Sequence, residues 1–357
     1  MMIFVMNSSY LLNEASSNEQ RMNNSDNFNL CKPKIIPGER LIVPQKNKSV
    51  LDLLITGRGN NYELVRHMKH AIFGEVVLAD IRPPNSGISV RKRSGKLVAI
   101  KIYQNQKLGD RHLFPRRKDD AIQESPFSEI AAMQYLESDG FHHPNIVNLL
   151  ECITDAERNI YCVMEYYDGM ELYEFVEVVK GSISEMQANC IFRQILYGLH
   201  YIHQRGICHR DMSLENIMLC NGGRVVIIDF GLCIRVDMES RDATVQHHMG
   251  QYGKKLYVAP EILQNISHYN GYLADLWSVG VILFILLTGV PPVEIAAPID
   301  HRFNLLQTSC LGQLLQESNA RALSTDVIDL LGNMLQTDPE KRLSIQEIFD
   351  HPWMKLL

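Results

Sequence analysis

The stretch from residue 209 to residue 231 constrains this chain more than any other. It contains His209-Arg210-Asp211, then Asn216 five positions after the aspartate, and then a β-branched run that leads into Asp229-Phe230-Gly231. This spacing predicts two carboxylates and one carboxamide at the ends of short loops, with a strand before the last of them. In-line phosphoryl transfer with bound magnesium needs such a set, because one carboxylate accepts a hydroxyl proton while the other groups hold metal ions.

The two tripeptides resemble the signature of the protein kinases, H-R-D-x-x-x-x-N followed by D-F-G. The resemblance implies ATP and Mg²⁺ as cofactors. It also implies that Asp211 accepts the proton of the substrate hydroxyl and that Asn216 and Asp229 hold the metal ions on the ATP phosphates. An alternative for Asp229 is a structural role, in which it only caps a strand-to-loop turn.

Length, composition and charge narrow the class of protein. The 357 residues are 46% apolar, enough for one large or two moderate domains with a substantial core. A net charge of −6 gives no reason to expect nucleic acid as a partner. The eight cysteines have no metal-ligand spacing, which predicts reduced thiols and an intracellular, cytoplasmic or nuclear location. No secretory signal is expected, and the longest apolar run, residues 279–287, is too short to span a bilayer.

The chain is expected to divide into three parts. Residues 1–58 are rich in Asn, Ser and Gln and lack a sustained period, which predicts a mostly disordered N-terminal extension. The resemblance implies an α+β, bilobal protein kinase fold for the remainder. Residues 59–165 would form a small lobe with an antiparallel sheet and one helix, and residues 166–357 a larger, mainly helical lobe, with ATP in the cleft between them.

The segment that would cover the phosphates departs from the family. Gly74 and Val76 match the kinase glycine-rich loop, but Lys69 and Ala71 stand where its first two glycines are expected. Glycines let this backbone fold closely over the phosphates, so side chains here are expected to loosen or reshape the cover. Two interpretations of Lys69 stay open: its charge serves a phosphate, or its side chain faces solvent.

Residues 97–101 resemble the strand that carries the ATP-binding lysine of the family. Strand alternation places Ala99 and Lys101 on one face of the sheet. The resemblance implies that Ala99 faces adenine and that Lys101 faces the α- and β-phosphates.

A helix is predicted after this strand. Ser125 and Pro126 suit its N-cap and first turn, and Glu129 lies within it. The resemblance implies that Glu129 pairs with Lys101 and holds it toward the phosphates. Glu124 is the rival partner.

Residues 162–169 are predicted to form a buried strand that leads into the hinge between the lobes. Met164 would be the gatekeeper, the backbone from Glu165 to Tyr167 would bind the adenine edge, and Met218 is a further expected nucleotide-binding residue. Glu171 falls where related kinases keep a carboxylate near the ribose and a basic substrate residue. The alternative is that Glu171 only complements a helix dipole.

The catalytic loop departs from the family two residues after Asp211. Ser/Thr kinases carry a lysine there that stabilises the transferring phosphoryl group, whereas this chain has Ser213. Glu215 also excludes the arginine that tyrosine kinases use. Loss of such a cation costs about 10²-fold or more in rate. Lys254 replaces the usual threonine of the peptide-binding loop, so we expect it to supply the missing charge. The alternative is that both changes mark decay.

Later motifs around Glu261, Asp275 and Arg342 complete the resemblance. The C-terminal part of the chain, which contains Arg342, is most similar to the calcium/calmodulin-dependent group. Asp275 is expected to bond the backbone of the catalytic loop, and Arg342 is expected to pair with Glu261. Together the motifs predict a protein kinase that phosphorylates serine or threonine in protein substrates. A pseudokinase with a binding or scaffolding role is the alternative, and a small-molecule kinase is disfavoured by the complete segment ending at Glu261. The oligomeric state stays open.

Overall fold

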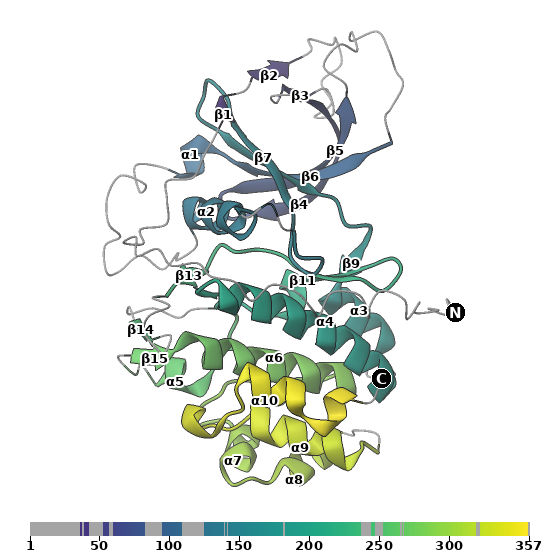
Figure 1. The fold of residues 1–357 in the computed structure, drawn as a ribbon, viewed down its shortest axis with the longest axis vertical. Coiled ribbons are helices and arrows are strands. Elements are labelled where there is room, and N and C mark those ends of the chain that lie inside the picture. The colour runs from purple at the N-terminus through teal and green to yellow at the C-terminus, as the bar shows by residue number, and fades with distance from the viewer. Residues whose placement is uncertain are drawn as a thin grey trace.

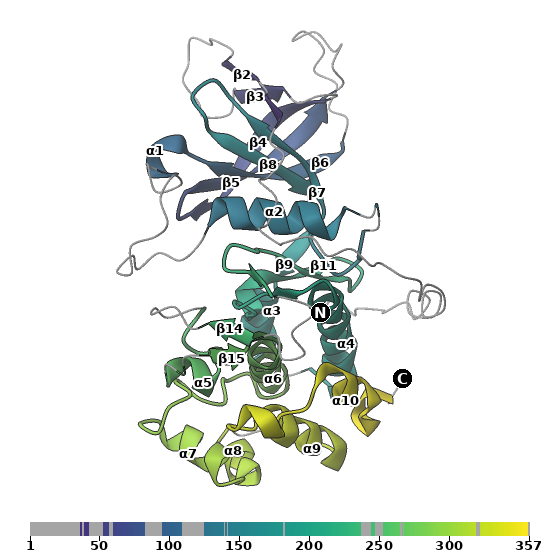
Figure 2. The same cartoon turned by 60° about the vertical axis from the view of Figure 1, so that its left-hand side comes forward.

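The polypeptide is arranged in two lobes that meet near the hinge segment (Figure 1). One lobe consists of a sheet with helix α2, the other mainly of helices, and Figure 2 shows β9 and β11 between them. The computed structural model describes residues 36–37, 39–42, 53–56, 60–82, 95–108, 125–138, 140, 142–180, 183–236, 244–246, 253–264, 266, 268–318 and 322–355.

The small lobe is built on one eight-stranded sheet with the order β1-β7-β8-β6-β5-β4-β3-β2. Every neighbouring pair is antiparallel except β1 and β7, which are parallel. The alternation expected of β6 is present, because Val98 and Ile100 are buried on the opposite face from Ala99 and Lys101. The strands are β1 (Ile36–Pro37), β2 (Glu39–Ile42), β3 (Leu53–Thr56), β4 (Asn61–Ala71), β5 (Gly74–Arg82), β6 (Leu97–Tyr103), β7 (Leu149–Thr154) and β8 (Ile160–Glu165).

Part of the predicted N-terminal extension belongs to this sheet. Strands β1, β2 and β3 all come from residues 1–58, and they add to both edges of the sheet. For these short segments the structure differs from the expected disorder, because their backbone groups pair with β7 and β4. The other residues of the extension, apart from those strands, lie outside the described part of the chain.

Helix α2 (Pro126–Leu136) begins as predicted. The side chain of Ser125 accepts a hydrogen bond from the Ser128 N–H, and Pro126 occupies the first turn. One face of the helix is buried in the apolar core, and that face also carries Glu129. The short helix α1 (Asn105–Leu108) precedes it.

The large lobe is organised around helix α6 (Gly271–Thr288). Asn270 caps its first N–H groups, and Gly289, with φ of 80°, ends it in the left-handed conformation. The helix is apolar on all sides and is therefore buried on all sides. Among the described residues it alone is long and apolar enough to cross a bilayer, but 78% of that stretch is buried inside the protein, as in a core helix.

The other helices of this lobe surround α6. They are α3 (Leu172–Val179), α4 (Glu185–Gln204), α5 (Pro260–Leu263), α7 (His301–Gln307), α8 (Leu311–Glu317), α9 (Thr325–Met334) and α10 (Ile345–Asp350). Short strands line the side that faces the small lobe or tie down loops. They are β9 (Gly169–Glu171), β10 (Ile207–Cys208), β11 (Ile217–Cys220), β12 (Val225–Ile227), β13 (Ile234–Arg235), β14 (Thr244–Gln246) and β15 (His268–Asn270).

A buried ion pair ties the end of the chain to α5, as the sequence predicts. The two terminal nitrogens of Arg342 lie 2.8 and 3.1 Å from the two carboxylate oxygens of Glu261. Arg342 also donates to the backbone oxygens of Leu273 and Gln336. Bidentate geometry with further hydrogen bonds is what allows two charges to remain buried.

Candidate active site

The backbone of the catalytic loop is held by a carboxylate from α6. Asp275 accepts hydrogen bonds of 2.8 Å from both the His209 N–H and the Arg210 N–H, as the sequence predicts. Arg210 has a φ of 66°, a left-handed conformation that is unfavourable for a side chain of this kind. The two bonds from the buried Asp275 offset that cost, so tertiary structure sets the direction in which the loop presents Asp211.

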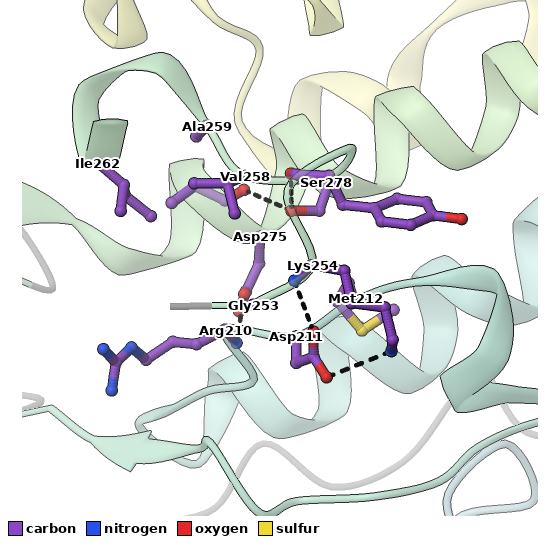
Figure 3. A pocket seen from close by; sticks show the side chains of 12 residues that line it. Arg210, Asp211, Met212, Gly253, Lys254, Val258, Ala259, Ile262, Asp275 and Ser278 are labelled. Carbon is purple, nitrogen blue, oxygen red and sulfur yellow. Dashed lines mark hydrogen bonds and ion pairs between the residues drawn. The ribbon is translucent and has the colours of Figure 1, made fainter. Parts of the chain in front are cut away.

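Asp211 and Asn216 are in direct contact across this loop. The side-chain nitrogen of Asn216 donates to the Oδ2 of Asp211 at 2.7 Å and to its backbone oxygen at 2.8 Å. Because both bonds use the amide nitrogen, Oδ1 is the atom that Asn216 can offer to a cation. The Oδ1 of Asp211 accepts a bond from the Lys254 N–H at 3.2 Å (Figure 3).

Asp229 lies at the end of the hairpin formed by β11 and β12. It has a φ of 66°, and its Oδ1 accepts the Gly231 N–H at 3.1 Å and lies 3.4 Å from the Nζ of Lys101. Burial acts to raise the pKa of Asp229, but the charge of Lys101 and the bond from Gly231 outweigh it and hold this pKa below its ordinary value. The carboxylate is therefore ionised at neutral pH.

These oxygens fit magnesium. Mg²⁺ prefers oxygen ligands, keeps several waters, and is usually bound by one or two carboxylates together with substrate phosphates. Asp229 and Asn216 offer a carboxylate and a carboxamide oxygen of this kind. Over the described part of the chain no cluster of three or more His, Cys, Asp or Glu side chains forms a cage for a metal ion.

Lys101 and Glu129 form the ion pair that the sequence predicts. The Nζ of Lys101 lies 2.8 Å from both oxygens of Glu129, and the Tyr103 hydroxyl donates to the same carboxylate at 2.5 Å. Burial raises the pKa of Glu129, and the charge of Lys101 opposes that shift. The rival partner, Glu124, lies outside the described residues.

A cavity of about 700 Å³ separates the two lobes beside these groups. Its size is that of a pocket for a small organic ligand or cofactor. Sheet register explains its upper wall, since Val76 pairs with Lys101 and Ala99 pairs with Met164, so that their side chains share one face. Every predicted site residue except Gly74 lines the cavity: Lys69, Ala71, Val76, Ala99, Lys101, Glu129, Met164, Glu165, Tyr167, Glu171, Asp211, Asn216, Met218, Asp229 and Lys254.

The hinge uses its side chains for anchoring. Glu165 accepts a hydrogen bond from Arg224 at 2.9 Å, and the guanidinium of Arg224 lies over the ring of Tyr167. The Tyr167 hydroxyl accepts the Asn148 N–H at 2.9 Å. The side chains of Glu165 and Tyr167 are thus occupied by contacts with Arg224 and with the segment before β7. The hinge backbone therefore remains to contact a ligand in the cavity.

Gly74 has a different position from the one expected. It is absent from the residues that line the cavity in the described part of the chain. A Cβ atom at this position would lie 1.7 Å from the backbone oxygen of Ile102, so glycine is required for the close approach of β5 to β6. The resemblance predicted that Gly74 belongs to the loop that covers the nucleotide, whereas the contacts of Gly74 in the structure are those of sheet packing.

The side chain of Lys69 is 52% exposed, as the solvent-facing interpretation expects, but it also contacts the large lobe. Strand β4 continues to Ala71 and turns into β5 through only two residues, so Lys69 and Ala71 are strand residues. The Nζ of Lys69 lies 2.7 Å from the Oε1 of Glu171 on the large lobe. Glu171 also precedes α3, and its N–H donates to Glu174 at 3.3 Å, so it contributes to the start of that helix as well.

Lys254 faces the catalytic loop. Its Nζ lies 2.7 Å from the Oγ of Ser213, 3.4 Å from the Oδ2 of Asp211 and 4.0 Å from the Oε2 of Glu215. The segment approaches closely because Gly253 has a φ of 79° and an added Cβ would lie 2.8 Å from the Arg210 backbone oxygen. Lys254 is the only positively charged side chain in this group of contacts, and it lies beside Asp211 (Figure 3).

Several lining residues had no assigned role in the sequence, among them Val147 and Ile228. Ile228 immediately precedes Asp229, and the Val147 N–H donates to Ile227 next to it. Both are apolar residues like many others in the chain. Only the tertiary contact between the segment of Val147 and the β11–β12 hairpin distinguishes them from ordinary core residues.

Two lobes that enclose a ligand-sized cavity, with a lysine between two carboxylates on its wall, are typical of phosphotransferases with the kinase fold. Residues 87–354 match the family described as protein kinase domain. Since the match covers well over half of the chain, the protein belongs to the protein kinase family. Members of this family in general use ATP and Mg²⁺ and act on proteins.

Individual relatives agree with this assignment. The maternal embryonic leucine zipper kinase of Danio rerio is 34% identical over 263 residues, covering 74% of this chain and 34% of the relative. CBL-interacting protein kinase 16 of Oryza sativa subsp. japonica is 32% identical over 306 residues, covering 85% and 58%. CBL-interacting serine/threonine-protein kinase 13 of Arabidopsis thaliana is 32% identical over 297 residues, covering 83% and 51%.

The chain therefore spans between about a third and somewhat more than half of the length of these relatives. They are consistent with the similarity of its C-terminal motifs to the calcium/calmodulin-dependent group.

Proposed function

We propose that this chain is an ATP- and magnesium-dependent protein kinase that transfers the γ-phosphoryl group to serine or threonine hydroxyls of protein substrates. One observation carries the proposal: Lys101 lies 2.8 Å from Glu129 of the small lobe and 3.4 Å from Asp229 of the large lobe. The contacts join α2, the sheet and the metal-binding loop, which is the alignment that phosphoryl transfer in this family requires.

Each residue has a chemical role in this proposal. Asp211 accepts the proton of the attacking hydroxyl, and its bonds to Asn216 and Lys254 fix its orientation. Lys101 orients the α- and β-phosphates. Asn216 and Asp229 would hold Mg²⁺, which supplies charge neutralisation on the phosphates when bound.

We also propose that Lys254 supplies the cation that position 213 lacks. Its Nζ lies between Ser213 and Asp211. It is therefore beside the Asp211 carboxylate, which would meet the substrate hydroxyl. A positive charge there favours the transition state, because negative charge spreads over the equatorial oxygens of the transferring group. The alternative of a scaffolding pseudokinase rested partly on Ser213, and these contacts weaken it.

The acceptor and location are further parts of the proposal. The segment 257–261 resembles that of Ser/Thr kinases, and one relative is named a serine/threonine-protein kinase. We propose an intracellular location, because all seven cysteines in the described residues are free. Burial raises the pKa of the Cys208 and Cys233 thiols near the site, so both are suited to the core and not to nucleophilic chemistry.

Radiolabelled ATP tests the proposal. The chain is incubated with Mg²⁺ and a generic basic protein, and the labelled amino acid is identified after hydrolysis, with Asp211→Asn as the control. We expect label on serine or threonine that disappears in the control. No label, together with a higher melting temperature in the presence of ATP, would instead indicate the pseudokinase.

A further inference from the structure

The hairpin of β4 and β5 forms the roof of the nucleotide cavity, and one ion pair joins this roof to the opposite lobe. The Nζ of Lys69, on β4, lies 2.7 Å from the Oε1 of Glu171, which precedes α3. The two residues are 102 positions apart, and both line the cavity. Their side chains are 52% and 26% exposed, so the pair lies at the mouth of the cavity and is accessible to solvent.

The pair occurs where the backbone of the roof is least able to close by itself. Glycine is missing at positions 69 and 71, and β4 stays paired with β5 up to Ala71, although the register shifts between His67 and Lys69. Ile72 at the turn is 53% exposed, so its side chain does not hold the tip against the large lobe. A roof of this kind lacks the backbone freedom with which glycines would fold it over phosphates.

We propose that Lys69 and Glu171 form a tether that keeps the roof closed over a bound nucleotide and slows its release. Lys69 is in this view a positioning residue that acts through Glu171. The inference rests on the proposed function only in requiring that the cavity binds a nucleotide. Closure of such a cover retains the ligand, and opening is needed before product leaves.

A different role for Lys69 would be direct attraction of the phosphates, and the two roles predict opposite effects at Glu171. In the tether, Glu171→Gln removes the partner of Lys69 and loosens the roof, so release becomes faster. In direct attraction, the same substitution frees the charge of Lys69 for the phosphates, so release becomes slower. Glutamine keeps a hydrogen-bonding oxygen at position 171, which limits the change to the charge.

The test measures dissociation of a fluorescent ADP from the full chain with Mg²⁺ by stopped flow, which does not depend on phosphoryl transfer. We expect Lys69→Met and Glu171→Gln each to raise the dissociation rate about two- to fivefold, the range for a partly exposed pair. The double variant should be no faster than either single variant. Lys69→Arg should dissociate at nearly the wild-type rate, and added salt should reduce the difference between wild type and Lys69→Met.

A matched control is available on the same hairpin. Glu75 pairs with His67 at 3.5 Å within the roof and does not join it to the large lobe. Glu75→Gln should therefore leave the dissociation rate unchanged, and melting temperatures confirm that each variant is folded.

Slower dissociation in Glu171→Gln, or additive effects in the double variant, would overturn the tether and leave the proposed function intact. A folded wild-type chain that binds no ADP or ATP would contradict the proposed function itself, and the tether with it.

Discussion

The Nζ atom of Lys254 lies 2.7 Å from the Oγ atom of Ser213, and the two residues come from segments 41 positions apart. Related Ser/Thr kinases carry the lysine at the position of Ser213 and a threonine at the position of Lys254. The chain therefore presents the same two groups, an ammonium and a hydroxyl, beside Asp211, but each comes from the other segment. Under the proposed function, this interaction would supply the cation that the catalytic loop lacks at position 213.

Replacing Lys254 by methionine is expected to reduce phosphoryl transfer by about 10²-fold or more, because a transition-state cation is lost. ATP binding should be little changed, since the lysine faces the acceptor side of the site. Steady-state rates and ATP-induced shifts in melting temperature measure the two properties. The neighbouring Lys255 is exposed, so Lys255→Met is the matched control. Normal turnover in Lys254→Met would refute the role.

Exchanging the two residues tests whether the charge or its location matters. The double variant Ser213→Lys with Lys254→Thr should recover activity relative to Lys254→Thr alone, because the cation returns from the other segment. The rates of the single and double variants give the coupling between the positions. If the double variant is as slow as Lys254→Thr, the two positions are not equivalent sources of the charge.

Removing Lys101 is expected to destabilise the fold in a way that depends on pH. Lys101→Met leaves the buried Glu129 without its partner, and breaking such a pair costs about 3–5 kcal/mol. Burial already raises the pKa of Glu129, and loss of Lys101 raises it further. A carboxyl whose pKa is higher in the folded chain than in the unfolded chain gives stability at low pH, and that stability is lost as the pH rises through the folded-state pKa.

The loss of unfolding free energy in Lys101→Met should thus be smaller at low pH than at neutral pH. Denaturant unfolding of wild type and variant at a series of pH values measures it. Lys355→Met, at an exposed position, serves as the control and should change stability little at any pH. A loss that is constant with pH would show that Glu129 does not titrate in the variant.

The pair of Arg342 and Glu261 gives a prediction on stability far from the cavity. Arg342 is fully buried, so Arg342→Met should lower the unfolding free energy by about 3–5 kcal/mol, because Glu261 would remain buried without its partner. Lys341, next in the chain, is 72% exposed and pairs with Asp338, so Lys341→Met should cost less than about 1 kcal/mol. Chemical denaturation compares them, and similar small losses in both variants would argue against a structural role for the buried pair.

Some contacts of the site could be predicted because they follow from local periodicity. Alternation along β6 places Ala99 and Lys101 on the face that lines the cavity, and the capping signal at Ser125 begins the helix that carries Glu129. Asn216 reaches Asp211 because only five positions separate them along a tight loop. These spacings act over one or two turns of backbone, where geometry depends on few other residues.

Other features could not be predicted in this way. The role of Gly74 depends on Ile102, a residue on a neighbouring strand, and Lys69 pairs with a residue 102 positions away. Strand β1 joins β7 in parallel although its own residues carry no clear strand pattern. In each case the packing of strands and lobes decides which residue is the contact partner. The local sequence does not indicate that packing.

The sequence by itself determined the chemical groups of this protein and their order, because the residues proposed as catalytic aspartate, metal ligands and ATP-binding lysine are recognised by residue type and short spacing. The tertiary structure decided which distant groups meet. It placed Lys254 beside Ser213, joined Lys69 to Glu171 and turned the catalytic loop through Asp275. The physical reason is that charge interactions act over a few ångströms, and only the packing of the two lobes brings residues 41 or 102 positions apart within that distance.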